Sequence, residues 1–494
     1  MKRTCGILLP VFSLPSPYGI GTLGRAAFDF IDFLHGAGQS YWQILPVGQT
    51  SYGDSPYQCL SSFAGNPYLI DLDELIRDGL LTKEEVTSRE WGNDRARVDY
   101  GLLFENRYPL LKLAAKRGIK RDKAALDAFI KENETWLSDY ALYYVLKEKF
   151  GMKAWAEWPE PARKRDEKAL AKYREELESE IQTVCYIQFL FFAQWKKLRE
   201  YAHLQNIEII GDVPIYTAPD SSDVWADPEN FQLDEECRPV AVAGVPPDSY
   251  RDDGQLWGNP LYDYDAMEKD GFGWWIRRID GAAKLYDVIR IDHFRGFESF
   301  WAVPAGEKTA INGKWVKGPG MKLLGVLKGW FPNVRFIAED LGYTTAEVRK
   351  LLDDTGFPGM KILEFAFLTR KDNADLPHNY TSHCVCYTGT HDNPPLAAWF
   401  NETERENVEA AKKYLGLNPA EGYNFGVIRG GMSSVAELFI AQMQDYLGTD
   451  ASSRINSPGV FGGNWQWRMT PGQATDALRE KIAETAKLYG RSAL

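Results

Sequence analysis

Four acidic residues each close an apolar run in this sequence. Asp212 ends Ile-Ile-Gly-Asp, Asp292 ends Ile-Arg-Ile-Asp, Glu339 ends Phe-Ile-Ala-Glu, and Asp392 ends Tyr-Thr-Gly-Thr-His-Asp. If these runs are parallel strands of a barrel, their carboxyl ends meet at the face where barrel enzymes place their active sites. Carboxyl groups in unlike surroundings carry out acid and nucleophile chemistry on glycosidic bonds. We therefore interpret Asp292, Glu339 and Asp392 as catalytic residues.

The surroundings of two of these carboxyl groups differ along the chain. Arg290 and Asp292 share one face of a strand because side chains alternate, so we expect Arg290 to lower the pKa of Asp292 and keep it ionised. Apolar Phe336 and Ile337 precede Glu339. Burial would raise the pKa of Glu339, as a general acid requires. The pair predicts a nucleophile at Asp292 and an acid at Glu339.

Other interpretations of these residues remain open at this point. A single acidic residue at a barrel rim is more often part of an ion pair, but three in register favour catalysis. Glu364, in Lys-Ile-Leu-Glu-Phe, competes with Glu339 as the acid, and spacing alone does not separate them. His293 and His391 each adjoin a carboxylate and are candidates to donate hydrogen bonds to substrate hydroxyls; His391 is the better placed.

The apolar runs recur with helical segments between them, which is typical of parallel strands buried on both faces. Eight runs are candidate strands: Gly6–Phe12, Tyr41–Val47, Ile207–Ile215, Val288–Phe294, Val334–Asp340, Met360–Phe367, His383–Asp392 and Glu437–Leu447. Eight strands alternating with helices predict an α/β fold, a (β/α)₈ TIM barrel with helical and loop insertions.

The intervening helices have local signals of their own. Arg25–His35 carries an apolar stripe and is followed by Gly36, a typical stop, and Thr344 with Glu347 forms a capping-box pattern. We expect residues 1–494 to form a single catalytic domain. Within it, residues 75–180 are charged and helical, as in Asp122–Phe150 and Glu167–Glu180, and predict an inserted subdomain.

A second long spacer, residues 217–270, is rich in Asp, Gly, Pro, Trp and Tyr. Long loops inside a compact domain are usually functional, so this stretch predicts a wall of the active site.

Composition excludes several functional classes. The net charge of −12 disfavours a nucleic-acid partner, because phosphate binding depends on Lys and Arg. The 16 tryptophans suit stacking on sugar rings, although most are expected in the core. The chain has neither a signal-peptide pattern nor an apolar run long enough to cross a membrane, and its six scattered cysteines predict a cytoplasmic protein.

The sequence does not predict a cofactor or a metal. Gly19-Ile-Gly-Thr-Leu-Gly24 matches a dinucleotide-binding pattern but follows a proline-rich turn and lacks the expected downstream acid. Cys384 and Cys386 share one face of a predicted strand, which favours buried packing over metal binding.

Together, several longer motifs resemble one known family, the 4-α-glucanotransferases called amylomaltases or disproportionating enzymes, glycoside hydrolase family 77, relatives of the α-amylases. The resemblance covers almost the whole chain. Its motifs are Leu14-Pro-Ser-Pro-Tyr-Gly-Ile-Gly, Gln43-Ile-Leu-Pro-Val-Gly, Ser55-Pro-Tyr-Gln, Gly211-Asp-Val-Pro-Ile, Gly244-Val-Pro-Pro-Asp, Trp257-Gly-Asn-Pro, Arg290-Ile-Asp-His-Phe-Arg-Gly, Ala338-Glu-Asp-Leu-Gly and Thr390-His-Asp-Asn.

The resemblance implies a role for each matching residue. It makes Asp292 the nucleophile, Glu339 the general acid/base and Asp392 the carboxylate that binds sugar hydroxyls and stabilises the transition state, and it argues against Glu364 as the acid. The remaining expected substrate contacts are Arg290, which would orient Asp292, His391 and His293, the donor-pocket residues Asp212, Ser55 and Tyr57, the lid residues Asp248, Tyr250 and Trp257 over the acceptor groove, and Asn464.

The expected reaction moves an α-1,4-glucan segment to the 4-hydroxyl of another glucan or of glucose, with malto-oligosaccharides as partners. An α-amylase-type hydrolase would use the same carboxylates with water as acceptor, and only the resemblance favours transfer. A non-catalytic glucan-binding barrel is a further alternative, which the complete set of carboxylates disfavours.

Overall fold

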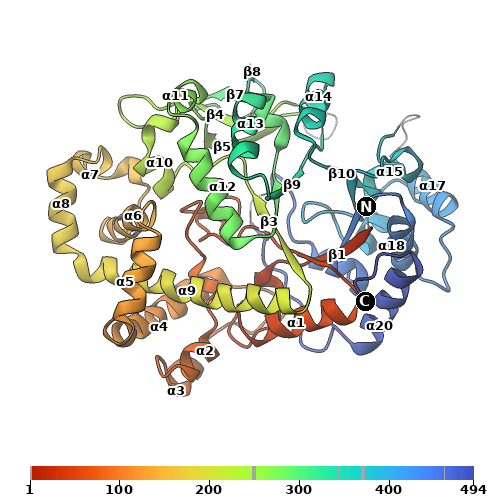
Figure 1. The fold of residues 1–494 in the computed structure, drawn as a ribbon, viewed down its shortest axis with the longest axis horizontal. Helices are drawn as coiled ribbons and strands as arrows, with labels where there is room; N and C mark the ends of the chain where they lie inside the picture. Colours follow the sequence, from red (N-terminus) through yellow and green to blue (C-terminus); the bar gives the residue numbers. More distant parts are fainter. Residues whose placement is uncertain (1–2, 248–251, 343, 369–372, 461) are drawn as a thin grey trace.

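The computed structural model describes residues 3–247, 252–342, 344–368, 373–460 and 462–494. In these residues, eight strands pair in parallel in the order β10-β11-β12-β1-β2-β3-β6-β9. Their bounds are β1 Thr4–Leu8, β2 Tyr41–Gln43, β3 Glu208–Val213, β6 Val288–Ile291, β9 Arg335–Ala338, β10 Gly359–Ile362, β11 Cys384–Tyr387 and β12 Leu438–Gln442. Each predicted run overlaps one of these strands, although β1 begins two residues and β10 one residue before its run, and the predicted (β/α)₈ barrel is confirmed (Figure 1).

The strands at the two ends of this order, β9 and β10, are joined by hydrogen bonds at the carboxyl end of β9. The amide of Ala338 donates to the carbonyl of Pro358 at 3.0 Å, and the amide of Met360 donates to Oδ1 of Asp340 at 2.7 Å. These bonds bring the edges together, so the carboxyl ends of all eight strands surround one opening.

Side-chain alternation separates two hydrophobic clusters. The barrel interior is filled by Leu8, Ile210, Val288, Ile337, Met360, Ile362, Val385, Tyr387, Leu438 and Ile440. Ile289 and Ile291 belong instead to the larger cluster between strands and helices, as do Cys384 and Cys386. Because side chains alternate, Arg290 and Asp292 follow Val288 on the inner face. The prediction that the C-x-C pair is buried packing is confirmed.

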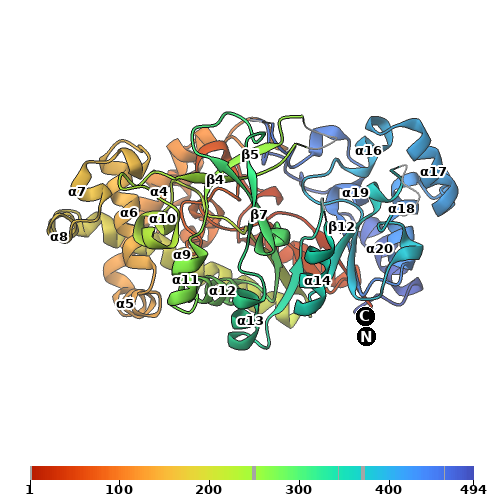
Figure 2. The same ribbon diagram turned by 90° about the horizontal axis from the view of Figure 1, so that it is seen from above.

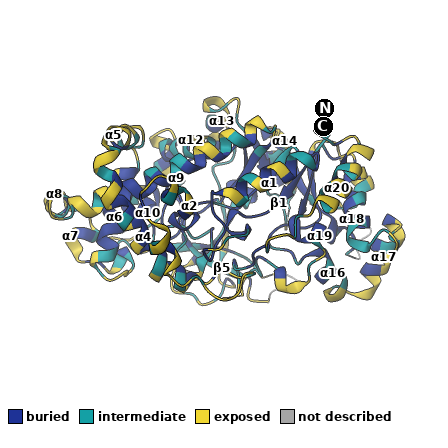
Figure 3. Ribbon diagram, turned by 90° about the horizontal axis from the view of Figure 1, so that it is seen from below, coloured by how far each residue is buried: buried dark blue, intermediate teal, exposed yellow. Residues whose placement is uncertain are grey.

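Helices cover the outside of the barrel, and buried residues gather along the strands and the helix faces turned toward them (Figure 3). The helices after the first insertion are α10 Ser222–Ala226, α11 Tyr264–Lys269, α12 Gly273–Leu285, α13 Met321–Trp330, α14 Ala346–Thr355, α15 Leu363–Ala366, α16 Leu396–Glu402, α17 Arg405–Leu415, α18 Tyr423–Ser433, α19 Met443–Leu447 and α20 Asp476–Leu488.

Two helix predictions near the barrel have different outcomes. Helix α1, Arg25–Gly36, matches its prediction to within one residue. The cap predicted at Thr344 is wrong, because the N-cap of α14 is Thr345, whose side chain accepts from the amide of Val348. The hydroxyl of Thr344 donates instead to the carbonyl of Asp340, so it closes the preceding turn.

The interval predicted as a helical insertion contains helices throughout. They are α2 Leu72–Arg77, α3 Lys83–Thr87, α4 Tyr100–Arg121, α5 Lys123–Glu132, α6 Leu137–Lys149, α7 Glu160–Arg163, α8 Glu167–Glu176 and α9 Glu178–Leu204. The predicted helical stretch Asp122–Phe150 contains the two helices α5 and α6, with residues 133–136 between them. Helices α4 to α8 lie at one end of the elongated molecule, and α9 returns the chain to β3 (Figures 1 and 2). The subdomain boundaries remain a prediction.

The second spacer is more ordered than the predicted loop wall. It supplies β4 Ala241–Val245 and β5 Gln255–Pro260, which pair with β7 Ser299–Pro304 and β8 Lys314–Lys317 in an antiparallel sheet ordered β5-β4-β7-β8. This sheet lies on the side of the molecule opposite the two termini (Figure 2). In β4 and β5, glycine and proline interrupt the alternation of apolar and polar residues. The sequence pattern therefore did not predict these strands.

A buried arginine connects the C-terminal segment to β1 and to the residues between α18 and β12. Arg491 is fully buried and donates to the carbonyls of Thr4, Met432, Ser434 and Ala436. Within the described residues, none of the helices has the length and apolar character needed to cross a membrane.

Candidate active site

Arg290 connects two of the predicted acidic residues. Its Nη1 atom lies 2.6 Å from Oδ2 of Asp212 and 3.0 Å from Oδ1 of Asp292. The strand register places Asp212 opposite Arg290, because β3 pairs with β6. Burial alone would lower the pKa of Arg290, but Asp212 and Asp292 raise it well above its usual value, so the guanidinium stays charged.

Glu339 follows β9 and is held by two backbone amides. Oε2 accepts from the amide of His293 at 2.8 Å, and Oε1 accepts from the amide of Leu341 at 2.8 Å. His293 has a φ of 51°, a left-handed conformation that is uncommon for a residue with a side chain and clusters at functional sites. This turn directs the amide next to Asp292 toward Glu339, so the two carboxyl groups occupy neighbouring positions.

Tyr57 and His391 connect Asp212 to the third carboxylate. The hydroxyl of Tyr57 donates to Oδ2 of Asp212 at 2.8 Å, and its ring stacks on His391 with centroids 5.1 Å apart. Nε2 of His391 lies 3.3 Å from Oδ1 of Asp392. Burial lowers the pKa of His391, so the imidazole is neutral near pH 7. The three predicted catalytic residues therefore border one continuous network.

Asp392 also has partners that the sequence analysis missed. The side-chain amide of Asn456 donates to Oδ1 of Asp392 at 2.6 Å, and Arg454 donates to the backbone carbonyl of Asp392 at 2.8 Å. Trp465 packs against both Tyr57 and His391, with centroids 5.8 and 6.0 Å away. These residues lie far along the chain from Asp392, and no local pattern marks them.

The electrostatics correct one expectation. Burial raises the pKa of Asp292 well above its usual range; Arg290 acts in the opposite direction, and the carboxylates of Asp212, Glu339 and Asp392 add to the rise. The expected net lowering of the Asp292 pKa by Arg290 is therefore wrong, because burial outweighs the attraction of a guanidinium that Asp292 shares with Asp212. Burial likewise raises the pKa of Glu339, as expected.

Of the three residues predicted to lie over the acceptor groove, Trp257 is among the described residues. The ring of Trp257, on β5, meets His293 edge-on with centroids 4.8 Å apart, and burial lowers the pKa of His293 to about 3. Asp248 and Tyr250 lie outside the described residues. Ser55 is half-buried, and its hydroxyl accepts from the amide of Tyr57, so it supports that ring.

Two further residues are placed away from the carboxyl cluster. The side chain of Asn464 bonds within its own loop, accepting from the amide of Ser457 and donating to the carbonyl of Val460. Glu364 is buried beneath the turn after β11, close to the backbone of Gly389 and near Asp445. Burial raises the pKa of Glu364 well above its usual range, so it is a neutral acid.

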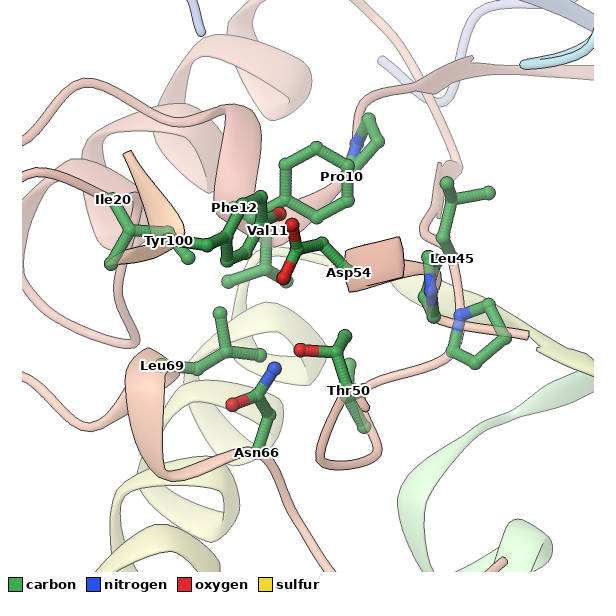
Figure 4. A pocket seen from close by; sticks show the side chains of 13 residues that line it. Pro10, Val11, Phe12, Ile20, Leu45, Thr50, Asp54, Asn66, Leu69 and Tyr100 are labelled. Carbon is green, nitrogen blue, oxygen red and sulfur yellow. The ribbon is translucent and has the colours of Figure 1, made fainter. Parts of the chain in front are cut away.

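Two cavities adjoin the loop that carries Ser55 and Tyr57. One, of about 60 Å³, is lined in part by Tyr57 and Asp212. The other, of about 10 Å³, has Asp54, Thr50, Asn66 and Tyr100 around it and has room for about one water molecule (Figure 4). Of the two, only the first adjoins residues of the carboxyl network.

The described residues contain no group of three or more His, Cys, Asp or Glu arranged to hold a metal ion. What the site does contain is a set of carboxyl groups with one shared cation, apolar stacking surfaces and neutral imidazoles. Such a set suits acid–base and nucleophilic chemistry on a neutral sugar.

Comparison with known proteins identifies the family. A family model described as 4-alpha-glucanotransferase matches residues 9–475. The 4-alpha-glucanotransferase of Clostridium butyricum is 49% identical over 97% of this chain and 99% of its own length. That of Thermus thermophilus is 47% identical over 99% of both chains. The chain belongs to the 4-alpha-glucanotransferase family, glycoside hydrolase family 77.

Solved structures agree with this family assignment. An amylomaltase from Streptococcus agalactiae in complex with acarbose superimposes with a TM-score of 0.97 at 43% identity, covering 99% of this chain and 100% of that one. An amylomaltase from Corynebacterium glutamicum, at 18% identity and a TM-score of 0.78, shares the fold. The prediction of a 4-alpha-glucanotransferase is confirmed over the hydrolase and the non-catalytic barrel. α-Glucans are its substrate class.

Proposed function

We propose that this 4-alpha-glucanotransferase works by retaining double displacement, with Asp292 as nucleophile, Glu339 as general acid/base and Asp392 as the transition-state carboxylate. The observation that carries the proposal is the sharing of one guanidinium between Asp212 and Asp292, next to a Glu339 held by backbone amides. Asp292 attacks C1 while Glu339 protonates the glycosidic oxygen, which gives a covalent glucosyl intermediate.

A hydrogen bond from Arg290 favours the ionised form of Asp292. Asp292 and Glu339 repel one another, so the pair favours one ionised and one protonated member. Burial raises the pKa of both acids, but of the two only Asp292 accepts a described hydrogen bond from the Arg290 guanidinium, so we assign the negative charge to the nucleophile and the proton to Glu339. Glu339 then accepts a proton from the incoming 4-hydroxyl, which remakes an α-1,4 bond.

The proposed substrate contacts follow the network. Tyr57 and His391 present stacked rings beside Asp212 and Asp392 on the donor side. Trp257 over His293 offers an aromatic surface for an acceptor sugar, because sugar rings stack on aromatic faces. From sequence alone, Asp248 and Tyr250 are proposed to complete the acceptor side. Ser55 is proposed for the donor pocket beside Tyr57, and Asn464 as a further substrate contact.

The test is incubation of the purified protein with maltotriose alone, with chromatography of the products. Transfer gives oligosaccharides longer than the trisaccharide together with glucose. The Asp292→Ala variant is expected to lose about 1000-fold or more of this activity, whereas the control Asp127→Ala, on an exposed ion pair of helix α5, keeps it. Near-normal activity in Asp292→Ala would refute the assignment.

We also propose that the protein works in the cytoplasm. All six cysteines are free thiols, which suits a reducing compartment. Fractionation of the source cells, with activity recovered outside the soluble cytoplasmic fraction, would contradict this location.

A further inference from the structure

Residues 454–456 form a short extended segment that lies against the loop carrying His391 and Asp392. The segment follows a single 3-10 turn, Ala451–Ser453, and Ile455 within it is fully buried. This burial anchors the segment in the core, while Arg454 and Asn456 on either side are half-buried and turn toward Asp392.

The contacts between the two segments involve both backbone and side chains. The amide of Asn456 donates to the carbonyl of His391 at 3.1 Å, and its side-chain Nδ2 donates to Oδ1 of Asp392 at 2.6 Å. Arg454 donates through Nη2 to the carbonyl of Asp392 and through Nε to the carbonyl of Asn456, both at 2.8 Å. The guanidinium thus ties the backbone of Asp392 to the residue that holds its carboxylate.

The side chain of Asp392 needs such support because it is 42% exposed at the mouth of the barrel. Within its own loop, the amide of Asp392 donates to Thr390 at 3.3 Å, which orients the backbone, and Nε2 of His391 lies 3.3 Å from Oδ1, a longer contact to the carboxylate than the 2.6 Å bond from Asn456. A hydrogen bond to a charged group is stronger than one between neutral groups, and it fixes the direction of the acceptor. The bond from Asn456 therefore restricts where the carboxylate points.

We propose that Asn456 is a positioning residue for the glucan-transfer reaction, holding the Asp392 carboxylate in the orientation that stabilises the transition state. This inference rests on the role assigned to Asp392 under the proposed function. Asn456 is suited to the task because an amide donates a hydrogen bond without adding a positive charge. A Lys or Arg at this position would offset the negative charge that Asp392 presents to the sugar.

Loss of this bond is expected to affect the transition state more than the ground state. The backbone contacts from Arg454 and from the amide of Asn456 remain when the side chain is shortened, so the loop keeps its position. The carboxylate then samples other rotamers, and an interaction made in the transition state weakens. Such a change lowers kcat and kcat/KM together and leaves KM nearly unchanged.

The test compares the kinetics of maltotriose disproportionation in three variants. Asn456→Ala is expected to lose about 10- to 100-fold in kcat, the range for removing one hydrogen bond to a charged group, with a similar KM and melting temperature. Asn456→Asp, which has the same shape but replaces the donor with a second carboxylate, is expected to lose more. Asn418→Ala is the control, since Oδ1 of Asn418 accepts a loop hydrogen bond from the amide of Glu421, away from the carboxyl groups of the site.

A double-mutant cycle separates positioning from a general structural role. If Asn456 acts through Asp392, Asp392→Asn with Asn456→Ala is no slower than Asp392→Asn alone. Additive losses, or wild-type kcat in both Asn456→Ala and Asn456→Asp, would overturn the inference. An active Asp392→Asn single variant would instead refute the proposed function, so the two failures are distinguishable.

Discussion

At the scale of single residues, the site works because similar carboxyl groups are placed in dissimilar surroundings. Asp292 bonds to Arg290, whereas Glu339 accepts only from backbone amides in the described contacts. Burial raises the pKa of both, and their mutual repulsion makes them titrate as a pair. The pH profile of the enzyme is therefore a direct measure of this arrangement.

We expect kcat/KM to fall as the pH rises through the raised pKa of Glu339, because the proton needed by the leaving group is lost. We also expect it to fall on the acid side, as Asp292 becomes protonated. Because burial raises both pKa values, both limbs should lie at higher pH than free carboxyl groups would give. Maltotriose kinetics measured across pH check this, and an acid limb below pH 4 would contradict it.

Glu339→Gln is the matching variant for this profile. It is expected to lose roughly 100- to 10,000-fold in rate, the usual size of a general acid–base contribution, and to lose the alkaline limb. In this variant the side-chain NH2 group would face one of the two backbone N–H groups, which places two donors against each other. The melting temperature of the variant must therefore be measured as well. An unchanged alkaline limb would assign that limb to another group.

At the scale of elements, helix α6 of the insertion is joined to the loop after β3 by a partly buried ion pair. The side chain of Lys147 is 4% exposed and contacts Asp220, which also accepts from the hydroxyl of Tyr143 and the amide of Trp155. Removing Lys147 leaves the partly buried Asp220 carboxylate without its cation. The contact thus joins the insertion to the wall of the site.

Lys147→Met is expected to destabilise the fold by about 1–3 kcal/mol, less than the roughly 3–5 kcal/mol of a fully buried pair, because Asp220 is 29% exposed and keeps its other two hydrogen bonds. Lys112→Met is the control, because Lys112 pairs with Glu148 on the surface and such pairs contribute about 0–1 kcal/mol. Urea unfolding of both variants measures the difference. Equal midpoints would show that the partly buried pair does not fix helix α6.

At the scale of the whole molecule, stability depends on pH through buried acids outside the reaction. Burial raises the pKa of Asp445 to about 7; its carboxyl group accepts from the hydroxyl of Thr388 and the amide of Leu396, and so spans the loop that carries Asp392. Burial also raises the pKa of Asp223 to about 6. Both acids are protonated more readily in the folded state than in the unfolded chain.

Because these folded-state pKa values lie above the unfolded value, their contribution to stability is fully present below about pH 4 and is lost as the pH rises to about 7. Asp445→Asn should remove the part of this loss of stability that comes from Asp445, since the side-chain amide can accept from Leu396 and donate to Thr388. We expect this variant to be more stable than the wild type at pH 8 and similar to it at pH 4. Urea unfolding at pH 4 and pH 8 measures the free energy of unfolding of both proteins. An unchanged pH dependence in the variant would contradict the raised pKa assigned to Asp445.

The sequence by itself determined the barrel and the position of its acids. Alternation along a strand places Asp212, Arg290 and Asp292 on the inner face, and parallel strands bring their ends together. These consequences are local, because they follow from the periodicity of the chain and the common direction of the strands. The three proposed catalytic residues therefore follow from the sequence alone.

Only the tertiary structure decided how those acids are held. The guanidinium of Arg290 is divided between two acids, the amide of His293 reaches Glu339 through a left-handed turn, and Asn456 reaches Asp392 across 64 positions. The antiparallel sheet β5-β4-β7-β8 likewise joins distant segments. Contacts between residues far apart in the chain depend on the geometry of closure, which no local pattern encodes, and the net pKa of each acid depends on those contacts.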